Sequence, residues 1–189
     1  MQVAYLLFAV LWIAFYAYWL VSAWKTRNPV KRRQPRLMFF LYGFVWVIIW
    51  VFLAYWFLPG LLAEQIVPDS PWAAVAGLII TAAGLGFAVW ARVHLGKNWS
   101  GMPLIHEHHT LTRTGPYRYV RHPIYSGITL GLLGTAIGTG YVIVFTCLIL
   151  VFVLFVMKSH MEEKFLEEEF GEDYVTYRRE VKALIPYVF

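Results

Sequence analysis

The sequence predicts an all-α integral membrane protein with five transmembrane helices. Of its 189 residues, 60% are hydrophobic and 14% are charged, whereas an ordinary soluble domain is about 45–50% apolar and about 25% charged. The apolar residues gather in five runs, and a bilayer accommodates such surface better than water does. The sequence therefore favours a multi-pass membrane protein over a soluble domain.

The apolar runs follow one another along the chain. Residues 3–24, 37–58 and 72–93 are each long enough to cross the hydrocarbon core, which takes about 20 apolar residues. Residues 124–138 and 141–157 are shorter, and the short joint Gly138-Thr139-Gly140 predicts that they form a tight helical hairpin. The polar segment 94–122 separates a three-helix region, residues 1–93, from a second region, residues 94–189, with two membrane helices and a helical tail.

Charge predicts the orientation of the chain. The loop after the first run is basic, whereas the next loop carries only Glu64 and Asp69. The positive-inside rule then places the amino terminus outside and puts residues 94–122 and the tail from Lys158 in the cytoplasm. The basic residues behind the net charge of +5 cluster beside the apolar runs, where they set this orientation, so no nucleic-acid partner is expected. No obligatory protein partner is evident either. The bases of the first loop are Lys25, Arg27, Lys31, Arg32, Arg33 and Arg36.

Small residues recur at helical spacing in two of the runs. In membranes, such stripes let helix backbones approach closely. A contact between the two helices is the favoured interpretation, and a face that borders a cofactor is the alternative. The stripes are Gly127, Gly131, Gly134 and Gly138 in the fourth run and Ala73, Gly77, Gly84 and Ala88 in the third.

Two polar segments flank the predicted hairpin. Proline at position 123 is a start signal for a helix, so Arg121 and His122 lie at the positive end of its dipole, where an anion would be stabilised. An interfacial role for this arginine is the alternative. The last run continues as a helix into the tail, and Glu162 and Glu163 stand where it leaves the membrane. A carboxylate at the membrane edge raises the free energy of the folded chain unless it has a polar or charged partner.

These segments resemble the isoprenylcysteine carboxyl methyltransferase family, within the wider group that includes phospholipid N-methyltransferases and thiol methyltransferases. The resemblance covers roughly residues 94–188. It rests on an Arg-His-Pro-x-Tyr-x-Gly run from Arg121 to Gly127, a Glu-Glu-x-x-Leu run at Glu162 about 35 residues later, and the stretch from Phe170 to Tyr177. The two motifs in this order are specific for the superfamily, but they carry little information on the substrate.

The resemblance implies a methyltransferase that uses S-adenosyl-L-methionine and takes a lipophilic or lipid substrate from the bilayer. A cytosolic cofactor site is expected between the loop before the fourth helix and the tail, with the ammonium of the cofactor at Glu162 or Glu163. The candidate catalytic residues are Arg121, Glu163 and Arg179, with Arg178 and Lys182 as alternatives to Arg179. The candidate cofactor contacts are His109, Leu111, Tyr117, Arg121, His122, Pro123, Tyr125, Glu162 and Glu163.

The acceptor is expected to be a carboxylate, because the basic residues of the tail favour an anionic reacting group. A phospholipid or amine N-methyltransferase and a thiol S-methyltransferase are the alternatives, and an NADPH-dependent reductase of the steroid-reductase type is a more distant one. A non-enzymatic membrane scaffold would not need the two charged motifs. The chain is compact and its spans are few, so a prokaryotic or organellar source is expected, with the prokaryotic inner membrane as the expected location.

A metal site is not expected. His106, Glu107, His108 and His109 are adjacent in the sequence, but zinc sites usually need helical or knuckle spacing and a further ligand. The single cysteine, Cys147, lies in an apolar run and cannot form a disulfide within one chain.

Overall fold

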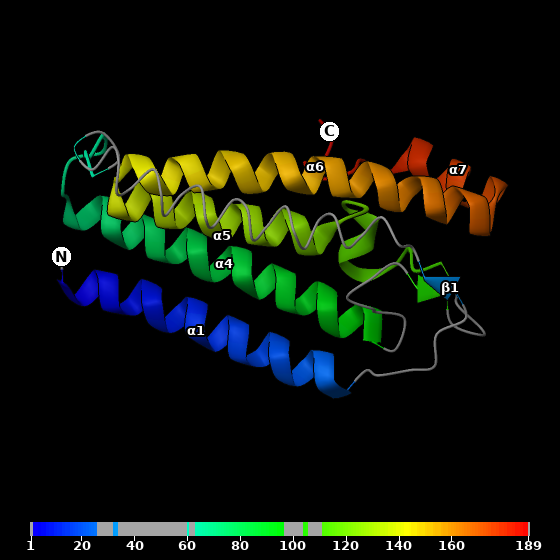
Figure 1. The fold of residues 1–189 in the computed structure, drawn as a ribbon, viewed down its shortest axis with the longest axis horizontal. Coiled ribbons are helices and arrows are strands. Elements are labelled where there is room, and N and C mark those ends of the chain that lie inside the picture. The colour runs from blue at the N-terminus through cyan, green and yellow to red at the C-terminus, as the bar shows by residue number, and fades with distance from the viewer. Residues whose placement is uncertain are drawn as a thin grey trace.

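The computed structural model describes residues 2–25, 32–33, 60, 63–96, 104–105 and 111–188. Four long helices run lengthwise beside one another, and a short helix and a strand pair lie at one end (Figure 1). We call this end, where α1 and α4 finish, the polar end. The elements are α1 (Gln2–Lys25), β1 (Arg32–Arg33), α4 (Pro71–Leu95), β2 (Leu104–Ile105), η3 (Gly115–Arg118), α5 (Pro123–Thr139), α6 (Val142–Phe170) and α7 (Glu172–Glu180).

Three of the described helices have the length and composition to cross a membrane: Gln2–Ser22, Pro71–Leu95 and Val142–Phe170. They correspond to the first, third and fifth apolar runs, whereas α5 has 17 residues. The predicted span at residues 37–58 lies outside the described residues. Trp24 and Trp72, at opposite ends of the helices, are 75% and 84% exposed, as expected for the aromatic belts of a membrane protein.

The glycine stripes form a contact between α4 and α5. A Cβ atom on Gly84 would lie 2.5 Å from the backbone nitrogen of Gly131 and 2.6 Å from the carbonyl oxygen of Gly127. A Cβ atom on Gly77 would lie 2.5 Å from the carbonyl oxygen of Gly134. The two backbones therefore touch without intervening side chains, and the favoured interpretation of the stripes as a helix contact is confirmed.

The helical hairpin is also confirmed, with a joint slightly later than predicted. Helix α5 continues through Thr139, and Gly140 adopts the left-handed conformation, with φ of 74°. This residue cannot carry a side chain there, since a Cβ atom would lie 2.2 Å from the carbonyl oxygen of Val67. Helix α6 then runs to Phe170, well beyond the apolar run. The predicted continuation of the last run as a helix into the tail is therefore confirmed.

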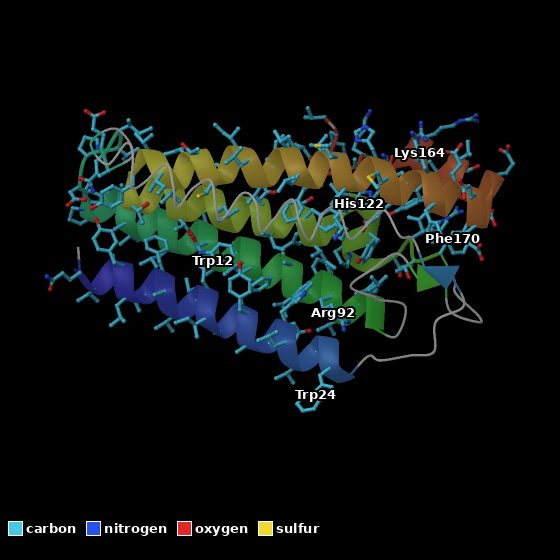
Figure 2. The ribbon with its side chains drawn as sticks, in the orientation of Figure 1. Trp12, Trp24, Arg92, His122, Lys164 and Phe170 are labelled. Atoms are coloured by element: carbon cyan, nitrogen blue, oxygen red, sulfur yellow. The ribbon has the colours of Figure 1, made fainter. Side chains whose placement is uncertain are left out.

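Contacts at the polar end tie the helices to each other and to the basic loop. Buried Arg92 donates hydrogen bonds to the carbonyl oxygens of Ser22, at 3.1 Å, and Gly96, at 3.2 Å, and so joins the ends of α1 and α4 (Figure 2). Strands β1 and β2 pair antiparallel, which the sequence did not predict because a two-residue strand has no periodic pattern. The basic loop and the polar segment 94–122 therefore meet at this end.

Candidate active site

The loop before α5 is held by the tail of the chain. The backbone N–H of Arg121 donates to the carbonyl oxygen of Lys182 at 2.8 Å, and that of His122 donates to Ala183 at 2.9 Å. The Ser126 hydroxyl donates to the Leu184 carbonyl at 2.6 Å. Because α5 begins at Pro123, these bonds fix the direction in which the two preceding side chains enter the site.

Arg121 forms a buried ion pair with Glu163 of α6. Its Nη2 and Nε lie 2.6 Å and 2.9 Å from the same oxygen, Oε1 of Glu163, and each side chain is 9% exposed. The remaining guanidinium nitrogen, Nη1, donates to the carbonyl oxygens of Arg178, at 3.2 Å, and Val181. The arginine therefore joins α6 to the tail, and all three of its nitrogens are engaged by the protein.

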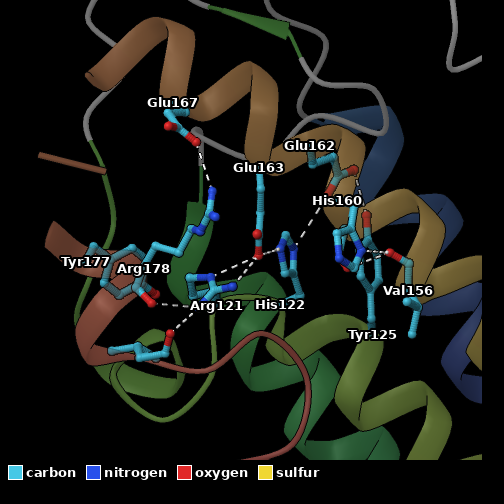
Figure 3. Close-up of polar contacts among 12 residues, drawn as sticks. Arg121, His122, Tyr125, Val156, His160, Glu162, Glu163, Glu167, Tyr177 and Arg178 are labelled. Atoms are coloured by element: carbon cyan, nitrogen blue, oxygen red, sulfur yellow. Dashed lines mark hydrogen bonds and ion pairs between the residues drawn. The ribbon is translucent and has the colours of Figure 1, made fainter. Parts of the chain in front are cut away.

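His122 lies between the two glutamates of α6 (Figure 3). Its Nε2 is 3.2 Å from Oε1 of Glu163, and its Nδ1 is 3.6 Å from Oε2 of Glu162. The Tyr125 hydroxyl donates to Oε1 of Glu162 at 2.7 Å. The Glu162 side chain is 19% exposed, so it is more accessible than that of Glu163.

Three stacked rings adjoin these carboxylates. The His122 and Tyr125 rings are 5.5 Å apart and inclined by 4°. The rings of Tyr125 and Phe155 are 4.6 Å apart and inclined by 9°. A flat aromatic surface beside a carboxylate can bind a cation that carries an apolar or planar substituent, because the ring face and the carboxylate both attract positive charge.

The 3-10 turn η3 packs beside the site region, because its Tyr117 lies in one apolar cluster with Ile124 and Tyr125. The Tyr177 hydroxyl of α7 donates to the carbonyl oxygen of Tyr117 at 2.6 Å. Burial raises the pKa of Tyr177 well above its ordinary value, so the hydroxyl stays protonated and this bond persists at neutral pH. Gly115, with φ of 59°, packs on the His94 ring, where a Cβ atom would lie 2.7 Å from Cε1.

The structure brings together most of the residues that the sequence singled out, whereas Arg179 lies apart from them and His109 is not among the described residues. Leu111 is half-buried ahead of η3, and His109, like the neighbouring His106–His108 cluster, lies outside the described residues. Arg179 is exposed on α7 and has no hydrogen bond or ion pair with any residue that the structure describes. The residues in the site region are Tyr117, Arg121, His122, Pro123, Tyr125, Glu162 and Glu163.

Two residues of the site were missed from the sequence. Lys158 lies 3.8 Å from Glu162 on the same helix, and the spacing of four residues could have indicated this pair. Phe155 completes the ring stack, but an apolar residue in an apolar run carries no signal of its own. Its role depends on the packing of α6 against α5.

The helices and the charged network define an all-α membrane protein whose candidate site lies at the polar end of the hairpin. Residues 72–173 match the family described as phospholipid methyltransferase. Since this match covers more than half of the chain, the protein belongs to that family. The resemblance stated from the motifs is thereby confirmed.

Individual relatives are similar over shorter stretches. Protein-S-isoprenylcysteine O-methyltransferase A of Arabidopsis thaliana is 30% identical over 120 residues, which are 62% of this chain and 61% of that protein. Methanethiol S-methyltransferase of Crocosphaera subtropica is 40% identical over 72 residues, 38% of this chain and 28% of that protein. The chain thus spans less than two thirds of the length of these relatives.

A solved structure has a similar fold. It is that of the eukaryotic intramembrane Ras methyltransferase, isoprenylcysteine carboxyl methyltransferase. The TM-score is 0.57 and the sequence identity 24%, over 79% of this chain and 52% of the other. At this identity the likeness shows the shared helical arrangement.

Proposed function

We propose that the chain is an S-adenosyl-L-methionine-dependent methyltransferase that modifies a lipophilic acceptor taken from the bilayer. The observation that carries this proposal is the partly exposed carboxylate of Glu162, which accepts a hydrogen bond from Tyr125 beside the ring stack. Membership of the phospholipid methyltransferase family supports the reaction type. When bound, the cofactor supplies a methyl group on a positively charged sulfur, so the protein has to position it and exclude water.

In this proposal Glu162 binds the ammonium of the cofactor. Glu163 is a weaker candidate, because Arg121 and His122 already lie within 3.2 Å of one of its oxygens. We assign Arg121 and Glu163 to positioning: the pair holds α6 against the tail and so fixes the adjacent Glu162. The candidate contacts at His109, Leu111, Tyr117 and Pro123 rest on the family resemblance.

Replacing Glu162 by glutamine should weaken binding of S-adenosyl-L-methionine by about 1.5–3 kcal/mol, the range for hydrogen bonds to charged groups. The change keeps the size of the side chain and removes its charge. Isothermal titration calorimetry on the detergent-solubilised protein measures the effect. The matched control is Glu168→Gln on the exposed side of the same helix, which should bind normally. Equal losses in both variants would refute the assignment.

The membrane arrangement in this proposal has five spans, an external amino terminus and a cytoplasmic site. The pairing of β1 with β2 supports the placement of the basic loop and the site region on one side. Arg33 and Gln65, which flank the part of the chain predicted as the second span, lie at opposite ends of the helices, since Gln65 bridges to Tyr141. The acceptor would enter between the helices from the lipid.

A carboxylate is the acceptor that we propose first. Of the relatives named above, the isoprenylcysteine methyltransferases match the larger share of this chain. The tail contributes Arg178, Arg179 and Lys182 near the site. Arg178 is paired with Glu167 at 2.9 Å, whereas the Arg179 side chain is exposed. An ionised carboxylate needs no base, but it needs a cation that holds it in a site shielded from water.

We expect Arg179→Ala to lower turnover at least about tenfold, equivalent to about 1.4 kcal/mol of transition-state stabilisation. Cofactor binding should stay nearly unchanged, because Arg179 lies outside the Arg121–Glu163 network. Initial rates with a prenylated cysteine carboxylate, together with calorimetry on the same preparation, separate the two effects. Loss of cofactor affinity at normal turnover would instead assign Arg179 to the cofactor, and no change would exclude it from both roles.

A thiol acceptor is the second candidate, supported by the 40% identity to methanethiol S-methyltransferase over 72 residues. Radiolabelled S-adenosyl-L-methionine offered with a prenylcysteine carboxylate, a small thiol and a phospholipid amine distinguishes the acceptors. Transfer to the carboxylate alone is the expected result. Transfer to the thiol or the amine would replace the proposed acceptor and keep the methyltransferase activity.

A further inference from the structure

A lysine of the chain itself occupies a position suited to a bound cation. Lys158 precedes Glu162 by four residues on α6, and its Nζ is 3.8 Å from Oε1 of Glu162. The same Nζ lies 5.1 Å from the centre of the Tyr125 ring. The side chains of Lys158 and Glu162 are 17% and 19% exposed, so the ammonium is largely enclosed by the site.

The surroundings of this ammonium are those that recognise a cationic ligand. An aromatic face within about 6 Å attracts a cation through the ring quadrupole, and a carboxylate attracts it by charge. Tyr125 provides the face, while its hydroxyl donates to the same Glu162 oxygen that Lys158 approaches. The ring also stacks on the rings of His122 and Phe155, which restrict its orientation.

Other cations nearby are directed elsewhere. Arg121 donates to Glu163 and to the tail carbonyl oxygens, and Arg178 pairs with Glu167. The His122 imidazole contacts both glutamates and stacks on Tyr125. Among the described residues, Lys158 is the ammonium group whose printed contacts include both the Tyr125 ring and Glu162.

We propose that Lys158 is a built-in competitor that occupies the place of the cofactor's amino group at Glu162 and Tyr125 and is displaced when the cofactor binds. This inference rests on the proposed function, which assigns the ammonium of the cofactor to Glu162. Two ammonium groups cannot share one carboxylate oxygen and one ring face without repulsion. Because the cofactor has to displace Lys158 in order to bind, its observed affinity is lower than it would be without the lysine.

The test is the affinity of Lys158→Met for three related ligands, measured by calorimetry on the 189-residue chain in detergent. Methionine keeps an unbranched apolar side chain and removes the charge. S-adenosyl-L-methionine and S-adenosyl-L-homocysteine both carry the amino group, and each should bind about fivefold more tightly, equivalent to about 1 kcal/mol. Methylthioadenosine lacks the amino acid part, so its affinity should stay unchanged.

Matched variants separate competition from general changes of charge or folding. Lys164→Met removes the same charge from an exposed position of α6 (Figure 2) and should leave all three affinities unchanged. Lys158→Arg keeps a cation and should bind like the parent chain. Lys158→Gln provides a second neutral side chain if the methionine variant does not fold.

The outcomes distinguish this inference from the proposed function. Weaker binding by Lys158→Met would make Lys158 a ligand of the cofactor and overturn the inference. Unchanged binding would also overturn it and leave the proposed function intact. Tighter binding of S-adenosyl-L-methionine alone would place the lysine at the sulfonium. That result would contradict its proposed position at the amino group. If the parent chain binds neither adenosyl ligand, both the proposed function and the inference fail.

Discussion

Replacing Glu163 by glutamine is expected to destabilise the folded chain by about 3–5 kcal/mol, the usual cost of removing one partner of a buried ion pair. The two side chains of the pair are each 9% exposed, and Arg121 points two nitrogens at one Glu163 oxygen. Without the carboxylate, the arginine remains buried as an uncompensated charge. Unfolding in a denaturing detergent, followed by circular dichroism, measures the loss.

A double variant tests the physical cause. Arg121→Met combined with Glu163→Leu removes both charges and should be less destabilised than either single change, because no unpaired buried charge remains. Glu169→Gln, exposed on the same helix, should change stability little. A double variant that loses the sum of the two single effects would contradict an unpaired buried charge as the cause of the destabilisation.

The second large effect is expected where α4 touches α5. Gly84→Ala should destabilise the chain by about 3 kcal/mol, the upper part of the usual range for overpacking. The added methyl group would lie 2.5 Å from the Gly131 nitrogen and 2.6 Å from the Gly127 oxygen. These are backbone atoms, so the two helices have to separate. The same unfolding measurement in detergent detects the change.

Gly86 supplies the matched control for this prediction. It lies on the same helix, two residues further on, and a Cβ atom there would meet nothing within 4 Å. Gly86→Ala should therefore be neutral or stabilise the chain by up to about 1 kcal/mol, because alanine restricts the unfolded backbone more than glycine does. Equal destabilisation by both alanines would show that helix separation is not the cause.

Much of the fold follows from the sequence by itself. The apolar runs predict the membrane helices α1 and α4 because their length matches the bilayer, and the shorter run at residues 141–157 predicts the membrane part of α6. The repeat of Gly77 and Gly84 predicts a face where a partner helix approaches closely, and Pro123 predicts the start of α5. Each of these features is encoded by neighbours within one helix. The motifs at Arg121 and Glu162 are likewise short, contiguous patterns in the sequence.

The pairing within the site was decided by the tertiary structure. From the sequence, Arg121 and the two glutamates were all expected to contact the cofactor, and the structure adds a direct ion pair between Arg121 and Glu163. The tail pairing at Lys182 and the contact of Lys158 with the Tyr125 ring were likewise not visible in the sequence. The chain segments concerned are 42 residues apart for the ion pair, so their distance depends on how α6 packs against α5 and where the tail returns. Residue spacing determines which side chains share a helix face, but only packing determines which faces meet.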